Sequence, residues 1–415
     1  MNSGFVPRAL TPTVLVGLAE SRVVVLEGAR QVGKSTLAEA VAVERGGRVV
    51  TMDDQDMRVA ATEDPVSVAD LGGDGLLVID EVQRVPAVVL AVKARVDRNK
   101  RPGQFLLTGS ANVSRLPEVG DALAGRAEVA TLYGFSQGEL HGRADSFVDR
   151  ALEGRLPAGH NSRLQRRDYM DLVVAGSYPE PGSRPANRRG RWYASYLSLV
   201  AGRDAADISG LRRLRDLPRV LEMIAARQGS EMVVASLAND AGLPRRTLDP
   251  YLALLDTLYL THDLLSWSTS LTKRAVKAHK TYLLDTGLAA HLLNLAAPGL
   301  EPGRNADAAG GLVEAFAVGE LRRQLGWSQT TARLAHFRDS DGHEVDIILE
   351  AADGRVVGVE VKAAASFQAK DARGLIHLRE KLGERFVAGL VLHTGPRQVP
   401  LGKRISAAPL DLLWS

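Results

Sequence analysis

A glycine-rich loop at residues 28–35 is the strongest chemical signal in the chain. It has the pattern G-x-x-x-x-G-K-S, it follows an apolar stretch, and it precedes a stretch with helical periodicity. Glycines let backbone N–H groups curl around a phosphate, and the start of the helix adds the positive end of its dipole. The pattern predicts that ATP binds through consecutive residues: Gly28, Ala29, Arg30, Gln31, Val32, Gly33, Lys34, Ser35 and Thr36.

Within this loop, we expect Lys34 to reach the β- and γ-phosphates and Ser35 to ligate Mg²⁺ through its hydroxyl. A second apolar stretch ends in two carboxylates, Asp80 and Glu81. An aspartate at a strand end suits Mg²⁺ ligation, directly or through water, and the adjacent glutamate suits polarising the attacking water. We therefore predict Mg²⁺-dependent ATP hydrolysis, with Ser35 and Asp80 at the metal and Glu81 as a catalytic residue.

A third apolar stretch, 104–108, also ends in polar residues, as expected of a strand that lies between the other two. Ser110 is the first choice to contact the γ-phosphate or the attacking water. Thr108 and Asn112 are the alternative residues for this role. The competing interpretation is that these polar residues only cap a loop.

Arg126 precedes the last apolar stretch of this region. An arginine at this place can enter the nucleotide site of a neighbouring subunit and neutralise charge in the transition state. A surface arginine is the competing interpretation, and Arg30 within the loop is a further one. A catalytic Arg126 implies that the chain forms a homo-oligomer.

Carboxylates and a lysine recur near the C-terminal end, on two stretches that alternate in the manner of β-strands. An Asp-Gly turn at 351–354 joins them into a predicted hairpin. Pairing in which opposite positions sum to about 706 brings Asp346 opposite Glu360, and Lys362 shares a strand face with Glu360. Two carboxylates and an ammonium group are the chemistry of the PD-(D/E)xK nucleases, in which the carboxylates hold Mg²⁺ or Mn²⁺ and the lysine orients water or stabilises the phosphate.

Two simpler interpretations of this C-terminal set stay open. One is an exposed ion pair worth less than about 1 kcal/mol, and the other is a nuclease-like fold kept as an inert scaffold. His336 and His343 lie near Asp346, but no pair of histidines has convincing metal-ligand spacing, so we interpret them as surface residues.

Segments spread along the chain carry a wider resemblance: GARQVGKSTL, LLVIDEVQRVP, FLLTGSAN, ALAGRAEVATLYGFSQGEL, AGSYPE, SYLSLVAGRDAADIS and KTYLLDTGLAAHLL. Together they resemble a family of prokaryotic AAA-like ATPases that have a C-terminal domain of unknown function with a restriction-endonuclease-like core. Ser177 stands where the family has a second glycine, and Gly202 where an acidic residue is usual. The resemblance covers nearly the whole chain, and the fold that it implies often supplies another metal-binding carboxylate at the position of Glu314.

Between these regions, residues 235–259 have the spacing of a helix-turn-helix. Basic residues at the start of its second helix would face a nucleic-acid groove, and later ones would form a basic wing. Asp249 and Pro250 weigh against this interpretation, because they add a negative charge to the helix and should kink it. A packing or protein-contact role is the alternative. The residues in question are Arg245, Arg246 and Thr247 in the helix and Lys273, Arg274, Lys277 and Lys280 in the wing.

We predict an α/β protein with an AAA-like P-loop NTPase parallel sheet, a helical and winged-helix middle, and a C-terminal α/β restriction-endonuclease-like domain. Further helices are expected at 34–45 and 311–325, and a linker at 303–311. The predicted boundaries are 1–140 for the ATPase core, 141–215 for a helical connector, 216–302 for the winged-helix-like region and 303–415 for the nuclease-like domain.

Composition narrows the class of protein further. The chain has 415 residues, of which 45% are hydrophobic, so it is long enough for several globular domains. Cysteine is absent, which excludes disulfides, zinc fingers, iron–sulfur ligation and thiol catalysis. The first residues lack a signal-peptide layout and no apolar run approaches the roughly 18 residues of a membrane helix, so we expect a cytoplasmic protein without a membrane partner. A net charge of +3 permits an anionic partner without requiring one.

The sequence therefore favours a Mg²⁺-dependent ATPase whose nucleotide cycle controls a C-terminal nuclease-like domain that acts on or binds nucleic acid. The alternative is an ATP-dependent switch or adaptor whose inert nuclease-like domain binds DNA or a protein. The expected partners are ATP and ADP, nucleic acid, further copies of the chain and a protein client that the sequence does not identify.

Overall fold

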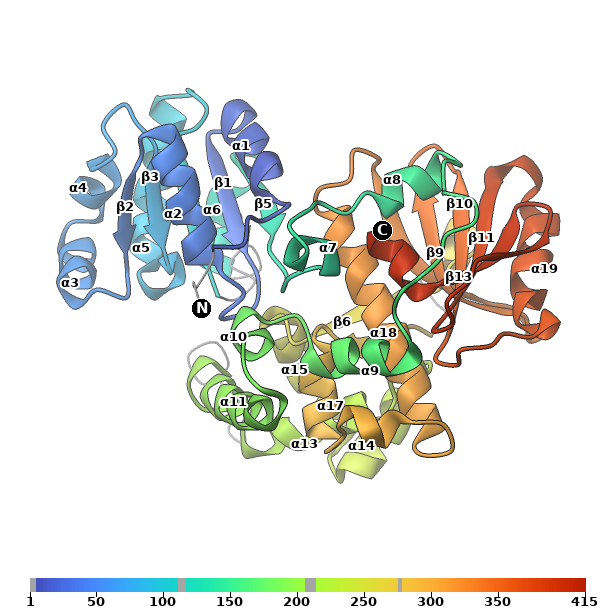
Figure 1. Ribbon diagram of the computed structural model, residues 1–415. Helices are drawn as coiled ribbons and strands as arrows, with labels where there is room; N and C mark the ends of the chain where they lie inside the picture. The colour runs from blue at the N-terminus through green and yellow to red at the C-terminus, as the bar shows by residue number, and fades with distance from the viewer. Residues whose placement is uncertain (1–4, 111–116, 206–213, 275–277) are drawn as a thin grey trace. The chain divides into compact units, whose positions relative to one another are not determined.

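The computed structural model describes residues 5–110, 117–205, 214–274 and 278–415, and it divides into two compact units (Figure 1). The first unit comprises Met1–Phe135 with Thr257–Tyr259, and the second comprises Ser136–Asp256 with Leu260–Ser415. The finer division of the chain into four parts stays a prediction.

The first unit is built on a parallel sheet with the strand order β2-β3-β4-β1-β5. β4 lies between β1 and β3, as predicted for the strand that follows Asp80 in the chain. Because all five strands run in one direction, their carboxyl ends meet at one edge of the sheet. The described elements are α1 (Thr11–Glu20), β1 (Val23–Glu27), α2 (Lys34–Arg45), β2 (Arg48–Thr51), α3 (Gln55–Glu63), α4 (Pro65–Asp70), β3 (Leu77–Asp80), α5 (Pro86–Arg98), β4 (Phe105–Gly109), α6 (Pro117–Leu123) and β5 (Ala127–Thr131).

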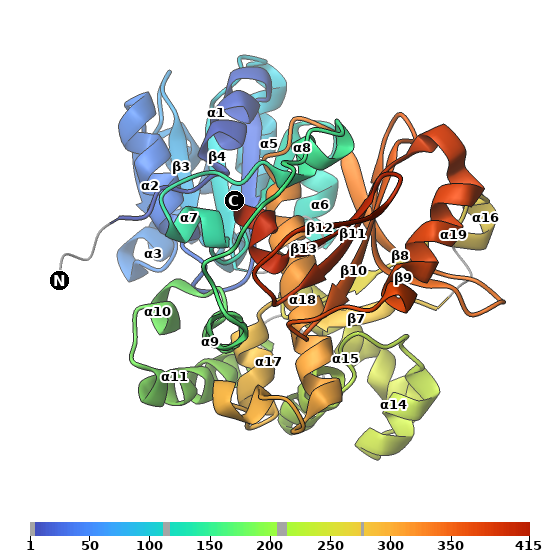
Figure 2. The same cartoon turned by 45° about the vertical axis from the view of Figure 1, so that its right-hand side comes forward.

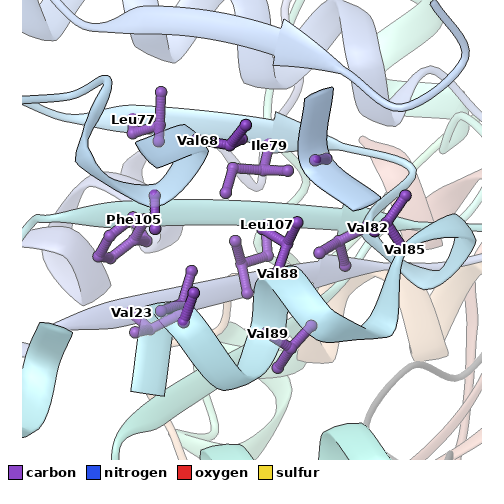
Figure 3. Close-up of a cluster of buried hydrophobic side chains, with 14 of the residues drawn as sticks. Val23, Val68, Leu77, Ile79, Val82, Val85, Val88, Val89, Phe105 and Leu107 are labelled. Atoms are coloured by element: carbon purple, nitrogen blue, oxygen red, sulfur yellow. The ribbon is translucent and has the colours of Figure 1, made fainter. Parts of the chain in front are cut away.

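The central strands of this sheet are apolar and buried on both faces, as is usual for parallel strands that helices cover. Every residue of β1, β3 and β4 is buried. Figure 3 shows Val88 and Val89 of α5 in the same apolar cluster as Ile79 of β3 and Leu107 of β4. This core holds the strand ends on which the predicted nucleotide-binding residues lie.

Helices fill the middle of the chain, and α9 and α17 pack against the long helix α18 (Figures 1 and 2). The predicted linker at 303–311 is wrong in its second part, because α18 begins at Ala306, where alanines favour a helix. α15 continues past Pro250. The described helices and strands of this region are α7 (Gln137–Leu140), α8 (Phe147–Leu152), α9 (Arg166–Ala175), α10 (Pro179–Gly182), α11 (Ala186–Leu199), α13 (Leu217–Ala225), α14 (Val234–Ala241), α15 (Arg245–Thr257), β6 (Thr261–Leu264), α16 (Leu271–Arg274), β7 (Lys280–Leu283), α17 (Thr286–Leu292) and α18 (Ala306–Leu325).

A mixed sheet with the order β12-β13-β11-β10-β9-β8 forms the C-terminal part of the second unit. β9 and β10 are antiparallel with Val357 opposite Leu349 and Val359 opposite Ile347, so the predicted register is confirmed. α19 connects β10 to its parallel neighbour β11 and packs on the sheet (Figure 2). The elements are β8 (Ala332–Arg338), β9 (Glu344–Ala351), β10 (Val356–Lys362), α19 (Arg373–Leu382), β11 (Phe386–His393), β12 (Val399–Gly402) and β13 (Ile405–Pro409). In the described part of the chain, no helix combines the length and apolar character needed to cross a bilayer.

Candidate functional site

The glycine-rich loop connects β1 to α2 with a backbone that favours glycine at two positions. Gly28 and Gly33 have φ angles of 150° and 97°. A Cβ on Gly28 would also collide with the carbonyl oxygen of Leu132. α2 begins at Lys34 without a side-chain cap, so the N–H groups of its first turn are suited to bind phosphate oxygens. Of the other predicted residues, Ala29 and Val32 are buried, Arg30 and Ser35 are half-buried, and Gln31 and Thr36 are exposed.

Two buried cations bind carbonyl oxygens of this loop. The Nζ of Lys34 donates to the carbonyl oxygens of Gly28 at 3.0 Å and Ala29 at 2.8 Å. The Nη1 of Arg8 donates to the carbonyl oxygen of Val32 at 2.8 Å. Arg8 is not among the residues predicted from the sequence, because it belongs to no motif and lies well before the loop in the chain.

Asp80, at the carboxyl end of β3, connects the loop to the neighbouring strands. Its Oδ1 accepts hydrogen bonds from the hydroxyls of Ser35, at 2.9 Å, and Thr108. Its Oδ2 accepts one from the hydroxyl of Thr51 at 3.2 Å. Carboxylate and hydroxyl oxygens are hard ligands that suit Mg²⁺. The two residues predicted to hold the metal, Ser35 and Asp80, therefore meet at one point.

Glu81 lies beside this point in a left-handed backbone conformation, with φ of 55°, which is costly for a residue with a side chain. Its backbone N–H donates to the hydroxyl of Thr108 at 3.2 Å. Its Oε2 accepts hydrogen bonds from the hydroxyl of Ser110, at 3.0 Å, and from the amide of Gln83. Of the three residues considered for this strand end, Ser110 and Thr108 both contact Glu81, and Asn112 lies outside the described residues.

Arg126 lies at the amino ends of the parallel strands, whereas the glycine-rich loop lies at their carboxyl ends. It precedes β5, whose first residue, Ala127, is paired with Val23 at the start of β1. The strand length, about 13 Å at about 3.3 Å per residue, separates it from the loop. Its Nε and Nη2 donate to the carboxylate of Asp97 at 2.6 and 2.9 Å, and these bonds lower the pKa of Asp97. Arg126 therefore does not reach the loop of its own chain, and a role in a neighbouring copy stays a prediction.

Tyr259 is a further residue of the first unit that was not predicted from the sequence. Its hydroxyl donates to Oε1 of Glu27 at 2.6 Å, and Glu27 directly precedes the glycine-rich loop. Burial and the negative charge of Glu27 raise the pKa of Tyr259 well above its usual range. Tyr259 thus holds the last side chain of β1 in place.

The C-terminal carboxylates come together on β9 and β10. Oδ2 of Asp346 accepts a hydrogen bond from the backbone N–H of Val361 at 2.8 Å, next to Glu360. Nζ of Lys362 donates to Oε1 of Glu360 at 2.8 Å. Oε2 of Glu360 is buried and has no hydrogen-bond partner among the described residues. The structure thus places all three residues of the predicted nuclease-like set within one cluster.

Lys280 belongs to this cluster, and its assignment to an exposed basic wing is wrong. It is 1% exposed, and its Nζ lies 2.8 Å from Oε1 of Glu314, 3.1 Å from Oε1 of Glu344 and 3.6 Å from Oδ1 of Asp346. The hydroxyl of Tyr282 also donates to Oε1 of Glu314, at 2.5 Å. Lys280 and Tyr282 are two positions apart on β7 and share a strand face, which is the signal that could have revealed them.

Burial and mutual repulsion change the acidity of this cluster. Burial, followed by the charge of Asp346, raises the pKa of Glu314 to about 8 against the opposing effect of Lys280. Burial and Asp346 likewise raise the pKa of Glu360 to about 8 against Lys362. Burial alone would lower the pKa of Lys280, but the carboxylates around it raise it overall. Positive charge stabilises these buried carboxylates, and Lys280 and Lys362 supply it.

A cleft of 860 Å³ in the second unit opens beside the cluster, and Glu314, Asp346 and Lys362 line part of it. Arg166 also lines it and donates through Nε to the carbonyl oxygen of Ala363 at 2.9 Å. A cleft of this volume is in the range of ligand-binding sites.

The helix-turn-helix region exposes Arg245 and Arg246 at the start of α15. Arg274 does not extend from a wing into solvent, because its Nη1 and Nη2 donate to the buried carboxylate of Glu350 at 2.7 and 2.9 Å. The wing prediction is therefore wrong for Arg274 as well. Lys277 and the side chain of Lys273 lie outside the described part.

His336 is fully buried, so its interpretation as a surface residue is wrong. Its Nε2 lies 3.1 Å from the carbonyl oxygen of Ala278. Burial and the charge of Lys280 lower the pKa of His336 to about 4. His343, in contrast, is half-buried.

Three family models match successive parts of the chain. Residues 20–141 match the family described as an AAA domain. Residues 166–299 and 309–413 match two families described as domains of unknown function, DUF8612 and DUF4143. The parallel sheet, the glycine-rich loop and the match to the AAA domain define the first unit as an AAA-like P-loop ATPase fold, followed by a helical middle and a C-terminal sheet.

Relatives of this chain are known in mycobacteria. It is 28% identical over 398 residues to uncharacterized proteins of Mycobacterium tuberculosis, Rv2008c, and Mycobacterium bovis, Mb2031c; the alignments cover 95% of this chain and 81% of each relative. Among solved structures, it is similar to the Walker-type ATPase paby2304 of Pyrococcus abyssi, with a TM-score of 0.40, 14% identity, and coverage of 70% of this chain and 97% of that one. AMPPCP-bound DnaA of Aquifex aeolicus has a TM-score of 0.30, 15% identity, and coverage of 60% and 86%.

Proposed function

We propose that this chain is a Mg²⁺-dependent ATPase whose nucleotide cycle switches the C-terminal domain. The observation that carries the proposal is the hydrogen bond between Ser35 and Asp80, which joins the phosphate loop to the carboxyl end of β3. Glu81 and Ser110 lie directly beside it. This arrangement combines an anion-binding backbone, a cation-binding pair and a carboxylate that can act on water.

The roles follow from the positions of the side chains. Lys34 and the N–H groups of the first turn of α2 bind phosphate oxygens. Ser35 and Asp80 supply hard oxygen ligands for Mg²⁺, which when bound neutralises phosphate charge. Glu81, held by Ser110, orients the attacking water and accepts its proton.

The position of Arg126 leads us to propose that the chain acts as a homo-oligomer. It is too far from the loop of its own chain, so a contribution to hydrolysis requires a second copy. The homo-oligomer and the catalytic role of Arg126 in the neighbouring site are proposed together. The ion pair with Asp97 would hold the guanidinium at the surface until a second copy binds.

For the C-terminal domain, the geometry favours a switch or adaptor over a metal-loaded nuclease. Lys280 already places an ammonium group among Glu314, Glu344 and Asp346. Bringing a divalent cation into the same place would add charge beside a buried lysine, which is unfavourable. We therefore propose that the C-terminal domain has a restriction-endonuclease-like core and that this core binds a partner, nucleic acid or protein, rather than cutting.

Nuclease activity is the second candidate, and the observation that favours it is the buried Oε2 of Glu360, which has no hydrogen-bond partner among the described residues. Asp346 and Glu360 would then hold Mg²⁺ or Mn²⁺, which supplies a Lewis acid at phosphate, with Lys362 orienting water. Cleavage of nucleic acid by the wild-type protein with ATP and Mn²⁺, and its loss in Asp346→Ala, would establish this candidate.

Nucleic acid is the proposed partner because Arg245 and Arg246 are exposed at the start of α15. α13, α14 and α15 followed by β6 and β7 have the order of a winged helix, which places the start of the third helix toward DNA. Changing both arginines to alanine should weaken DNA binding and flatten its salt dependence.

The test of the ATPase proposal is steady-state ATP hydrolysis over a range of Mg²⁺ concentrations. Ser35→Ala removes the hydroxyl that meets Asp80, so turnover and its Mg²⁺ dependence should both be lost. Ser195→Ala, an exposed serine of the second unit, is the matched control and should behave as wild type. Unchanged hydrolysis in Ser35→Ala would reject the proposed site.

A further inference from the structure

Asp339, His343 and His377 bring three metal-ligating atoms together away from both carboxylate sites. Asp339 follows β8, His343 precedes β9, and His377 lies on α19. Oδ2 of Asp339 lies 3.1 Å from Nδ1 of His343 and 3.1 Å from Nε2 of His377. The three ligand atoms lie within 4.8 Å of one another.

The local structure orients the carboxylate of Asp339 and brings the two imidazole rings beside it. Oδ1 of Asp339 accepts the backbone N–H groups of Asp341, at 3.0 Å, and His343, at 2.9 Å, so Oδ2 is directed toward the two rings. The rings of His343 and His377 are stacked, with centroids 4.0 Å apart and planes 5° from parallel. Phe337 stacks on His377 with a centroid distance of 6.1 Å.

One ligand atom has no other assigned role. Nε2 of His377 is buried and has no hydrogen-bond partner among the described residues, although Oδ2 of Asp339 lies close to it. A buried polar atom without a partner is costly, and a bound ion would satisfy it.

The spacing fits a small transition-metal ion. Bonds of about 2.0–2.1 Å in a tetrahedron place ligand atoms about 3.4 Å apart, so both distances of 3.1 Å from Oδ2 need little adjustment. The lone pair of an imidazole nitrogen lies in the plane of its ring, so one of the two stacked rings must turn out of the stack for both nitrogens to face one ion. Two imidazoles and one carboxylate suit late first-row ions such as Zn²⁺, whereas Mg²⁺ prefers oxygen ligands alone.

We propose that Asp339, His343 and His377 form a binding site for Zn²⁺ or a related late first-row divalent cation. The site joins the β8–β9 loop to α19. It is independent of the proposed ATPase function.

The test is a Zn²⁺ titration of the full chain by calorimetry, with excess Mg²⁺ present to occupy oxygen-only sites. Wild type should bind one Zn²⁺ that His343→Ala and His377→Ala each weaken by about tenfold or more. Co²⁺ should give a visible absorption band that the same variants lose. His160→Ala is the matched control, because His160 also contacts a carboxylate, Asp411 at 2.8 Å, outside the three-ligand cluster.

Asp339→Asn keeps the size of the side chain and serves as a second variant if the alanine variants fail to fold. It should lose Zn²⁺ affinity while its melting curve without metal stays cooperative. Zn²⁺ affinity and the Co²⁺ spectrum that stay unchanged in folded Asp339→Asn, or the absence of Zn²⁺ binding to wild type at micromolar concentrations, would overturn the proposal.

Discussion

Two clusters of carboxylates in this chain are held by different partners. In the first unit, hydroxyl groups hold them: Ser35, Thr51 and Thr108 at Asp80, and Ser110 at Glu81. In the second unit, lysines hold them: Lys280 beside Glu314, Glu344 and Asp346, and Lys362 beside Glu360.

The two kinds of partner, hydroxyl groups and lysines, differ in the positive charge that they bring to the carboxylates. The hydroxyls at Asp80 carry no positive charge, which agrees with the proposal that the first cluster accepts Mg²⁺ together with a nucleotide. Lysines compensate the charge of the second cluster from within the chain. Carboxylates at strand ends therefore do not identify a metal site until their nearest cations are known.

The largest expected effect is on nucleotide binding. Lys34→Ala removes the ammonium group that we propose binds the phosphates, so ATP binding measured by calorimetry should be abolished. Lys100→Ala, an exposed lysine of the same unit, is the control and should bind as wild type. Unchanged ATP affinity in Lys34→Ala would defeat the assignment of the loop.

Arg126→Ala should lower ATP turnover by about 10³-fold or more if the side chain completes a neighbouring site. Specific activity of wild type should rise with protein concentration. Mixing Arg126→Ala with Glu81→Gln subunits should recover part of the activity, because each supplies the group that the other lacks. Concentration-independent turnover in a proven monomer would refute this role.

Glu81→Gln should bind ATP normally and hydrolyse it more slowly by a factor on the order of 10², because the amide cannot accept a proton from water. Single-turnover kinetics separate this step from product release. The exposed Glu63→Gln is the matched control. Parallel losses of affinity and turnover in Glu81→Gln would show that the residue binds nucleotide instead.

Lys280→Met should leave three carboxylates without their central cation. The loss of a buried partner costs about 3–5 kcal/mol, so the melting temperature without metal should fall. Mn²⁺ should then stabilise this variant more than it stabilises wild type. Lys403→Met, at an exposed position, is the control. If Mn²⁺ raised the melting temperature of wild type and of Lys280→Met equally, Lys280 would not be the group that excludes the metal ion from this cluster.

The smallest effect concerns pH. The pKa of Glu314 and of Glu360 is about 8 in the folded chain against an ordinary value of 4.5, so the folded state binds protons that the unfolded state releases. Stability contributed by these protons is present at low pH and is lost as the pH rises toward about 8. Glu314→Gln should flatten this decline in melting temperature relative to wild type, and Glu63→Gln should not. Equal slopes in all three proteins would contradict the raised pKa values.

How much of this the sequence predicts depends on how local each feature is. The phosphate loop and its order with Asp80 were predictable because motif, strand and helix are contiguous. The hairpin register was predictable because an Asp-Gly turn and strand alternation leave few alternatives.

Features that depend on tertiary contact were missed. Nothing in the basic segment before Lys280 shows that its side chain is buried among carboxylates from two other elements, α18 and β9. Asp339 and His377 are 38 positions apart in the numbering, and only the packing of α19 brings them together. Arg126 directly precedes β5, and β5 runs parallel to β1. Arg126 therefore lies at the end of the strands away from the glycine-rich loop, which the sequence alone does not show.

The most direct test of the difference between the two clusters is to count bound Mn²⁺ per chain by electron paramagnetic resonance. The titration uses full-length His343→Ala/His377→Ala protein, with and without a non-hydrolysable ATP analogue. We predict one tightly bound Mn²⁺ that requires the analogue and disappears in Lys34→Ala, and a second, analogue-independent Mn²⁺ only after Lys280→Met. Tight Mn²⁺ binding without nucleotide that is lost in Asp346→Ala would contradict the account and establish the C-terminal cluster as a metal site.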